Sequence, residues 1–303
     1  MMPIELNNGK LRVRVVPEIG GSIIECAVHR EGQWISLMRE GEDPLTKSSN
    51  ASSFVLIPYS NRLRDGHFTF SGRSYQLRDE DKHAIHGDVR DRPWSVQERT
   101  KNHVILDFDS RNVANLNFPF PFAARLSYLL EDSSLLSRIE LINSGTASMP
   151  AGCGFHPYFN RRLPGSTGEV ELQLAVKAVY PGETPLPTGS AVPIEAYQDF
   201  SRQRPLDVEL DHCFSGWSRQ GVIEWPGSGI TARIEAEASM EHVIVFSPPG
   251  KEFFAIEPVT NANDGFNLYA KGDMNCGVVV LQPSESLTAG FRMQIDVGRV
   301  SVN

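Results

Sequence analysis

The sequence predicts an all-β protein, a large antiparallel β-sandwich or barrel, and two observations lead to this fold class. Short runs in which polar and apolar residues alternate recur along the chain, as in residues 10–15, where lysine and arginine alternate with leucine and valine. Glycine, proline, asparagine and aspartate separate these runs, whereas sustained helical periodicity is hard to find. Many short strands with such separators are typical of sandwiches and barrels.

The expected strands lie on both sides of a proline-rich stretch, residues 181–193, which we therefore interpret as a long loop within one domain of residues 1–303. Between two of the strands, Ser71-Gly72 predicts a hairpin turn, and residues 281–287 are expected to form another turn. The expected strands are residues 10–15, 23–29, 68–70, 74–77, 103–108, 123–130, 135–142, 170–176, 229–235, 242–246, 253–257, 278–281 and 291–297.

Charge and composition exclude several classes of function. The chain has 29 Lys+Arg against 37 Asp+Glu, a net charge of -8, and no basic stripe that could follow a phosphate backbone, so we expect no nucleic-acid partner. No apolar run approaches the roughly 20 residues that a membrane-spanning helix needs. The start of the sequence also lacks a basic segment followed by an apolar one.

The 4 cysteines are widely separated and form no Cys-x-x-Cys pair. This spacing favours free thiols in a reducing compartment over a disulfide framework. Together with the missing membrane and export signals, it predicts a cytoplasmic protein.

One histidine stands in an unusual segment near the middle of the chain. His156 lies among three aromatic residues, after Gly152 and Gly154 and directly before Pro157. The glycines supply unusual backbone angles or close backbone approach, and the proline pushes His156 toward an extended conformation. A histidine held in this way is either a working residue or a core residue bonded to a carbonyl group.

A second candidate region, residues 58–66 and 83–94, is dense in hydrogen-bond donors of fixed geometry. It contains Trp94, which could stack on a sugar face, and two close histidines, His83 and His86. Strand residues three apart point to opposite faces, so this pair has the wrong spacing for a metal site, and we expect no metal.

Two carboxylates complete the candidate residues. Glu257 directly follows an apolar run, residues 253–256, so we expect it to be partly desolvated, which would raise its pKa and its basicity. The alternative for Glu257 is a salt-bridged strand end. Asp211 precedes a histidine and a cysteine, and the alternative for it is a turn residue.

Taken together, these segments resemble the aldose 1-epimerase (galactose mutarotase) family. Each stretch alone is a weak signal, but the set occurs in the family's order over about residues 55 to 295, and the ordered set is specific. The matching stretches are Asn61-Arg62, Asp65-Gly66, His83-Ala84-Ile85-His86-Gly87, His156-Pro157-Tyr158-Phe159-Asn160, Asp211-His212-Cys213-Phe214, Glu257 with its polar loop, and Gln282-Pro283 to Gly290-Phe291.

The resemblance implies a galactose mutarotase-like supersandwich and an isomerase that interconverts the α and β anomers of an aldohexose without a cofactor. Its partner would be a small-molecule sugar, and we expect a monomer or a homodimer. By the same resemblance, Glu257 is the general base on the anomeric hydroxyl and His156 the general acid on the ring oxygen. Arg62, His86 and Asp211 would hold the substrate.

Two alternatives stay open at this point. Residues 61–65 and 88–94 are richer in charge than is expected of the galactose enzymes, and they contain Arg64, Arg90 and Arg92. Because arginine binds anionic groups in bidentate geometry, a phosphorylated or sulfonated hexose is an alternative to a neutral one. A protein of another class, a non-catalytic carbohydrate-binding β-sandwich, would need Trp94 and polar loops but no paired acid and base.

Overall fold

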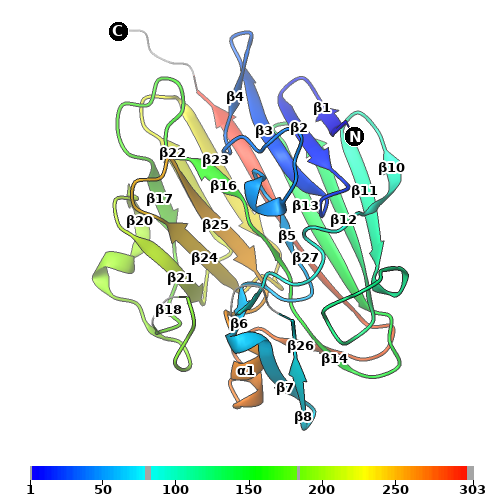
Figure 1. Ribbon diagram of the computed structural model, residues 1–303. Coiled ribbons are helices and arrows are strands. Elements are labelled where there is room, and N and C mark those ends of the chain that lie inside the picture. Colours follow the sequence, from blue (N-terminus) through cyan, green and yellow to red (C-terminus); the bar gives the residue numbers. More distant parts are fainter. Residues whose placement is uncertain (1, 79–82, 183–184, 299–303) are drawn as a thin grey trace.

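Two large antiparallel sheets dominate the computed structural model, which describes residues 2–78, 83–182 and 185–298 (Figure 1). The larger sheet has nine strands. In spatial order they are β10 (Ser95–Arg99), β11 (His103–Asp109), β12 (Phe122–Glu131), β13 (Ser134–Asn143), β27 (Ser286–Val297), β23 (Ile230–Ala236), β22 (Gln220–Trp225), β17 (Glu171–Leu174) and β20 (Phe200–Pro205).

The second sheet has eight strands and carries the residues of interest. Its order is β19 (Val192–Pro193), β18 (Ala178–Val179), β21 (Leu210–Ser215), β24 (His242–Ser247), β25 (Phe253–Val259), β15 (Gly154–Phe155) and β5 (Val55–Leu56), and β16 (Tyr158–Asn160) also pairs with β25.

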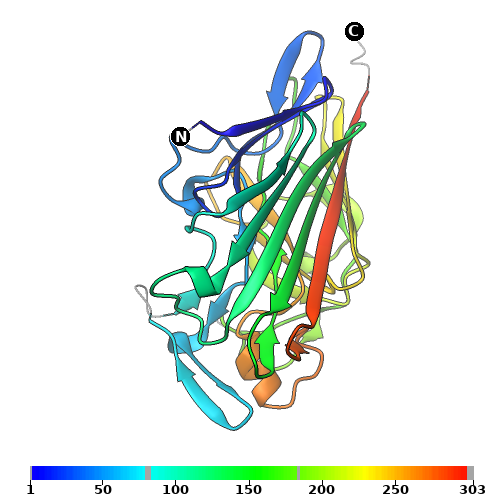
Figure 2. The same cartoon turned by 90° about the vertical axis from the view of Figure 1, so that its right-hand side faces the viewer.

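Smaller elements surround the two sheets. The short helix α1 and the hairpin of β7 and β8 lie together at one end of the molecule in both views (Figures 1 and 2). The smaller strand groups are β1 (Ile4–Asn7), β2 (Leu11–Val16), β3 (Ser22–Arg30) and β4 (Gln33–Ser36); β6 (Arg62–Leu63) with β9 (Ala84–Ile85); β7 (His67–Phe70) with β8 (Arg73–Gln76); and β14 (Met149–Ala151) with β26 (Val279–Leu281). The helices are α1 (Gly265–Ala270) and the 3₁₀ turns η1 (Ser48–Asn50), η2 (Arg64–Gly66), η3 (Ser110–Asn112) and η4 (Ala196–Gln198).

The burial of side chains explains the sequence pattern of each sheet. In β12 and β13 buried and more exposed residues alternate, as expected of a sheet with one face in the core and one toward water. Strands β24 and β25 are buried on both faces: Phe254 and Ile256 belong to the main core, whereas Val259 belongs to a second apolar cluster on the other face. Glu257 is on that second face, because side chains alternate along a strand.

The predicted all-β antiparallel fold is confirmed. Each expected strand is found, with ends that differ by a few residues, and Ser71 and Gly72 form the predicted hairpin turn with φ of 48° and 73°. Residues 282–285 form a turn in which the Glu285 N–H donates to the Gln282 carbonyl. Among the described residues no helix is long and apolar enough to cross a membrane.

Candidate functional site

The strand register places His156 opposite Glu257. Strand β15 pairs Gly154 with Val259, and β16 keeps the same register with β25. Counting two residues along each chain from the Gly154–Val259 pair reaches His156 on one side and Glu257 on the other. His156 Nε2 accordingly lies 3.1 Å from Glu257 Oε1, and both side chains are buried.

The same row of side chains extends across β5. The His156 N–H donates to the carbonyl of Phe54 at 2.9 Å, which continues the β15–β5 pairing by one residue. The Phe54 ring stacks on the imidazole, with ring centroids 4.6 Å apart and planes inclined by 26°. On its other side, the Tyr158 ring centroid lies 4.3 Å from that of His156. The imidazole is therefore held between two aromatic rings on a paired, extended backbone, as the flanking Pro157 predicts.

Asp211 reaches the site from β21. Ile244 of β24 lies opposite Glu257, and Cys213 of β21 lies opposite Ile244. Asp211, two residues before Cys213, therefore faces the same side of the sheet as Glu257. It is a strand residue rather than a turn residue.

His86 and Arg62 come from the small β6–β9 ladder, which pairs Arg62 with Ile85. Asn61 and His86 flank that pair, both with positive φ (52° and 61°), and the His86 N–H donates to the Asn61 carbonyl at 2.8 Å. This turn directs the His86 ring toward His156, with 5.3 Å between ring centroids and planes inclined by 82°. Residues distant in sequence thus meet in one place.

Glycines near the site allow close backbone approach. A methyl group at Gly152 would lie 2.0 Å from Asn261 Oδ1, and one at Gly154 would lie 2.8 Å from the Pro258 carbonyl oxygen. Neither glycine has a positive φ in this structure. Of the two roles that the sequence allows for the pair, the structure therefore shows close approach.

Burial dominates the electrostatics of the two carboxyl groups. Glu257 is 2% exposed, and this desolvation, with a further contribution from Asp211, raises its pKa well above the ordinary value, while Arg62 acts in the opposite direction. The pKa of Asp211 is raised too, mainly by burial. The expected desolvation of Glu257 is found.

The two histidines are shifted the other way. Burial, together with Arg39, Arg90 and Arg62, lowers the pKa of His156 to about 3, and burial also holds the pKa of His86 well below its ordinary value. Because burial disfavours charge on each member, the His156–Glu257 pair favours a net neutral state that contains one proton. Moving that proton from Glu257 to His156 produces a carboxylate base beside an imidazolium acid.

Three polar atoms of the site have no hydrogen-bond partner among the described residues. They are His156 Nδ1, His86 Nδ1 and Glu257 Oε2. The buried His242 is a useful contrast, because its Nδ1 lies 3.1 Å from the Thr260 carbonyl oxygen, as in an ordinary core histidine. Buried polar groups are normally paired, so unpaired atoms at one place indicate contacts that a ligand completes.

Several residues near this site are missing from the sequence-based set. The guanidinium carbon of Arg39 lies 3.5 Å from the centroid of the Tyr158 ring, and Arg39 donates to the Ala51 carbonyl at 3.0 Å. The Phe54 ring stacks on the His156 imidazole. Asn263 is 2% exposed, and its Oδ1 has no partner among the described residues. The signal that could have found Phe54 is the apolar run of residues 54–57, whereas nothing in the sequence links Arg39 to Tyr158.

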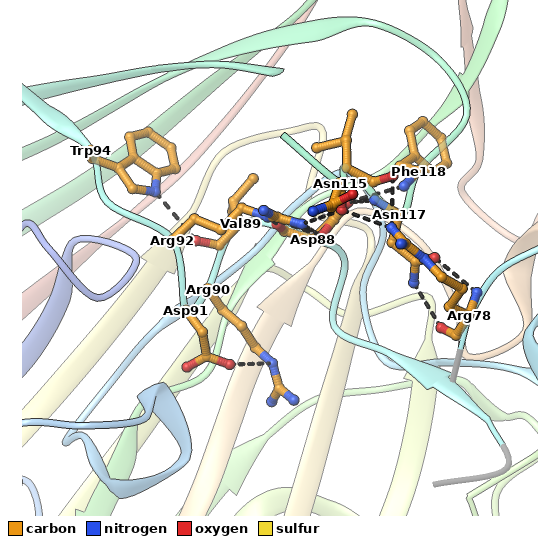
Figure 3. A network of polar contacts seen from close by, with 11 residues as sticks. Arg78, Asp88, Val89, Arg90, Asp91, Arg92, Trp94, Asn115, Asn117 and Phe118 are labelled. Carbon is orange, nitrogen blue, oxygen red and sulfur yellow. Dashed lines mark hydrogen bonds and ion pairs between the residues drawn. The ribbon is translucent and has the colours of Figure 1, made fainter. Parts of the chain in front are cut away.

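Trp94 is not a sugar-stacking residue, which corrects the sequence-based expectation. Its side chain is 5% exposed, its Nε1–H donates to the Val89 carbonyl at 3.4 Å, and its ring packs 5.5 Å from that of Phe108 (Figure 3). It therefore belongs to the core. The Trp94 side chain packs against apolar residues of strand β11, such as Phe108, although polar residues precede Trp94 in the sequence.

The histidine pair of the sequence is separated in space. His83 Nδ1 accepts a hydrogen bond from the Asp65 N–H at 2.8 Å, while His86 faces His156. Within the described part of the chain, no group of three or more His, Cys, Asp or Glu residues is arranged to hold a metal ion.

Comparisons with known proteins agree on one family. The family model described as aldose 1-epimerase matches residues 2–294. Among curated proteins, the uncharacterized protein YphB of Escherichia coli is 26% identical over 96% of this chain and 98% of its own length.

Two solved structures share the fold. A galactose mutarotase-like protein from Clostridium acetobutylicum has a TM-score of 0.83 at 21% identity, covering 97% of this chain and 94% of that one. A GalM/aldose epimerase homologue from C. elegans has a TM-score of 0.82 at 17% identity, covering 98% of this chain and 99% of that one. At these identities the likeness shows the fold alone.

Proposed function

Because this chain belongs to the aldose 1-epimerase family, a family of sugar isomerases, we propose that it is a mutarotase that interconverts the α and β anomers of an aldohexose. The proposed reaction needs no cofactor, since two proton transfers are sufficient to open and close a pyranose ring. The observation that carries the proposal is the buried His156–Glu257 pair, 3.1 Å apart, with unpaired polar atoms around it.

The proposed mechanism uses the proton that moves between Glu257 and His156. With the proton on His156, the Glu257 carboxylate takes the proton of the C1 hydroxyl while the His156 imidazolium gives its proton to the ring oxygen. The bond between C1 and the ring oxygen breaks, and C1 becomes an aldehyde. After rotation about the C1–C2 bond the two transfers run in reverse, and the ring closes on the other face.

The other three residues are proposed to hold the sugar during rotation. The Arg62 guanidinium and the His86 imidazole offer donors, and the Asp211 carboxylate offers acceptors, so together they can bind hydroxyl groups of either kind. Arg62 also acts on all the titratable groups, because it lowers the pKa of Glu257, Asp211 and both histidines. Fixing the open chain prevents its escape, which is a positioning role.

Polarimetry on freshly dissolved α-anomers of several aldoses tests the proposal. We expect the protein to accelerate the change in rotation well beyond the buffer rate, which must be subtracted. A protein that binds these sugars, seen by calorimetry, and accelerates none of them is the non-catalytic carbohydrate-binding alternative.

Glu257→Gln tests the assignment of the base. Glutamine keeps the shape of the side chain but lacks a basic oxygen, and a positioned general base contributes roughly 10²- to 10⁴-fold. We expect a folded variant that binds sugar and loses most of the catalysed rate, and His156→Asn should behave likewise. Since acid and base act in one reaction, the double variant should lose less than the product of the single losses. Activity of Glu257→Gln within a few-fold of the parent would remove Glu257 from the mechanism.

A further inference from the structure

The catalytic pair lies in a region with more positive than negative charge. Three arginines, Arg39, Arg62 and Arg90, lower the pKa of His156. The two carboxyl groups nearby, Asp211 and Glu257, are both shifted toward their uncharged forms by burial. A site with this balance attracts an anionic ligand more strongly than a neutral one.

Most arginines around the site are already bound to other groups, as Figure 3 shows for two of them. Arg92 donates to Asp88 Oδ1 at 2.6 and 3.0 Å, and Arg78 donates to the Asn115 and Leu116 carbonyls at 2.7 and 3.1 Å. These two guanidinium groups therefore stabilise the chain around them and are not free to bind a ligand.

Two more arginines are also engaged. Arg64 donates to the Pro187 carbonyl at 3.0 Å, and Arg39 donates to backbone carbonyls beneath Tyr158. The Arg62 guanidinium has no such bond among the described residues, but it acts on the carboxyl groups of Asp211 and Glu257, whose pKa values it lowers.

Arg90, unlike Arg62, shifts the pKa of neither Asp211 nor Glu257. Among the described residues its guanidinium has no hydrogen-bond partner, and its ion-pair contact, from Nε to Asp91 Oδ2, measures 3.7 Å. The side chain is nevertheless only 24% exposed. In Figure 3 its side chain extends away from the Asp88–Arg92 network. Its contacts with Asp91 and with the Phe54 ring are not hydrogen bonds, so the guanidinium N–H groups can donate to a ligand.

The position of Arg90 connects the catalytic pair to a cavity. Its guanidinium carbon lies 5.7 Å from the centroid of the Phe54 ring, which stacks on His156. Arg90 also lines a cavity of about 590 Å³, together with Gly87 and Asn117. Arg90 therefore lies between the ring that stacks on His156 and this cavity.

The backbone beneath Arg90 is fixed. A methyl group at Gly20 would lie 2.1 Å from the Arg90 carbonyl oxygen, and the Gly20 N–H donates to the Arg92 carbonyl at 2.8 Å. At the start of the same loop, the Asp88 carboxylate accepts a hydrogen bond from the Phe118 N–H at 3.0 Å. The guanidinium is thus carried on a rigid loop, which reduces the entropy lost when a ligand binds.

We propose that Arg90 determines substrate specificity, by binding an oxyanion that the sugar carries away from C1, so that the preferred substrate is an anionic aldose. This inference rests on the proposed mutarotase function. The shared chemistry is a phosphate, sulfate or carboxylate group, and substrates that differ only in that group distinguish among the three.

The experiment compares kcat/KM for glucose, glucose 6-phosphate, glucose 6-sulfate and glucuronate in the parent and in Arg90→Gln. A charge-assisted hydrogen bond of this kind corresponds to roughly 10- to 100-fold in kcat/KM, so the parent should prefer at least one anionic sugar by about that factor. Arg90→Gln should lose the preference, measured as the ratio of kcat/KM for the anionic sugar to kcat/KM for glucose in the same variant. Arg90→Lys, which keeps the charge but lacks the planar guanidinium group, should retain part of the preference.

Arg111→Gln is the matched control, because it removes the same charge from an arginine that is 59% exposed and paired at the surface. It should keep the parent's preference. If the parent converts glucose as fast as its anionic relatives, or if Arg90→Gln keeps the preference, the assignment of Arg90 is wrong while the mutarotase function stands.

Equilibrium binding provides a readout that does not depend on turnover. Calorimetric titration of glucuronate and glucose should show a preference for glucuronate in the parent that Arg90→Gln lacks, and that weakens with added salt. Equal binding of the two sugars by the parent overturns the proposal. Binding preference without acceleration of any sugar instead contradicts the proposed function and supports the role of Arg90.

Discussion

At the scale of single residues, backbone contacts decide which positions near the site accept a side chain. Gly152→Ala should destabilise the protein, because the new methyl group would lie 2.0 Å from Asn261 Oδ1, the atom that accepts the Ser60 N–H. Overpacking of this kind typically costs about 1–3 kcal/mol. The free energy of unfolding, measured with urea, should fall by about that amount.

Gly168→Ala is the control for this prediction. Gly168 is exposed, it has no positive φ, and a methyl group there would meet nothing within 4 Å. Its free energy of unfolding should stay within about 0.5 kcal/mol of the parent's. Equal stability of the two variants would show that the loop containing Asn261 moves to make room for the added methyl group.

The sequence predicts individual site residues better than it predicts their partners. The apolar run before Glu257 predicts its desolvation, and the proline after His156 predicts its extended backbone. Their 3.1 Å contact depends on a register between strands about 100 residues apart, which no local pattern encodes. The same limit applies to Arg90 and Arg92, which are alike in sequence but differ in space because Asp88 binds only the second of them.

At the scale of elements, strand length and burial decide what can be predicted. The longer alternating strands, such as β12 and β13, follow directly from the period-two pattern. Strands β5 and β15 have two residues each, and are fixed by long-range pairing rather than by propensity. These short strands position Phe54 and His156, whereas Glu257 and Asp211 come from the longer β25 and β21. The sequence therefore predicts the sandwich but not the row of side chains across it.

The loop of residues 88–92 offers a test at this scale. Asp88 accepts hydrogen bonds from Arg92 and from the backbone N–H groups of Asn117 and Phe118, and is only 11% exposed (Figure 3). Asp88→Ala would leave these donors without their acceptor, at a cost of about 2–4 kcal/mol. Hydrogen exchange should become faster in residues 86–92 and 115–118.

Asp296→Ala serves as its control. Asp296 is 48% exposed and pairs with Arg233 at the surface, where an ion pair contributes at most about 1 kcal/mol. Exchange in residues 86–92 should not change in this variant. If Asp88→Ala also leaves that exchange unchanged, the loop is held by its backbone contacts with Gly20 instead.

At the scale of the whole molecule, folding buries ionisable groups that the proposed reaction uses. Glu257, His86 and His156 are all buried, and the pKa of each is shifted in the direction that favours the uncharged form. Folding therefore disfavours charge at the place where the proposed reaction creates it. The stability of the whole protein must then depend on pH through these groups.

The direction of that dependence follows from the pKa shifts. His156 has a pKa of about 3 in the folded protein against 6.5 for the free side chain, so an unfolded chain binds a proton between these values that the folded chain does not. Such a histidine contributes stability above about pH 6.5 that is lost as the pH falls toward 3. Glu257 acts oppositely, because its raised pKa contributes stability at low pH that is lost as the pH rises through the folded value.

Unfolding by urea at pH 7.5 and pH 5.5, compared between the parent and His86→Asn, isolates the contribution of His86, because both proteins contain Glu257. Each buried histidine with a strongly lowered pKa should cost about 1.4 kcal/mol over the unit below pH 6.5. His86→Asn, in which asparagine tolerates the positive φ, should reduce the pH-dependent loss by about that amount whatever its overall stability. His67→Gln, at an exposed position, should leave the loss as in the parent. A His86→Asn variant with the parent's loss would show that the folded protein protonates His86 as readily as the unfolded chain does.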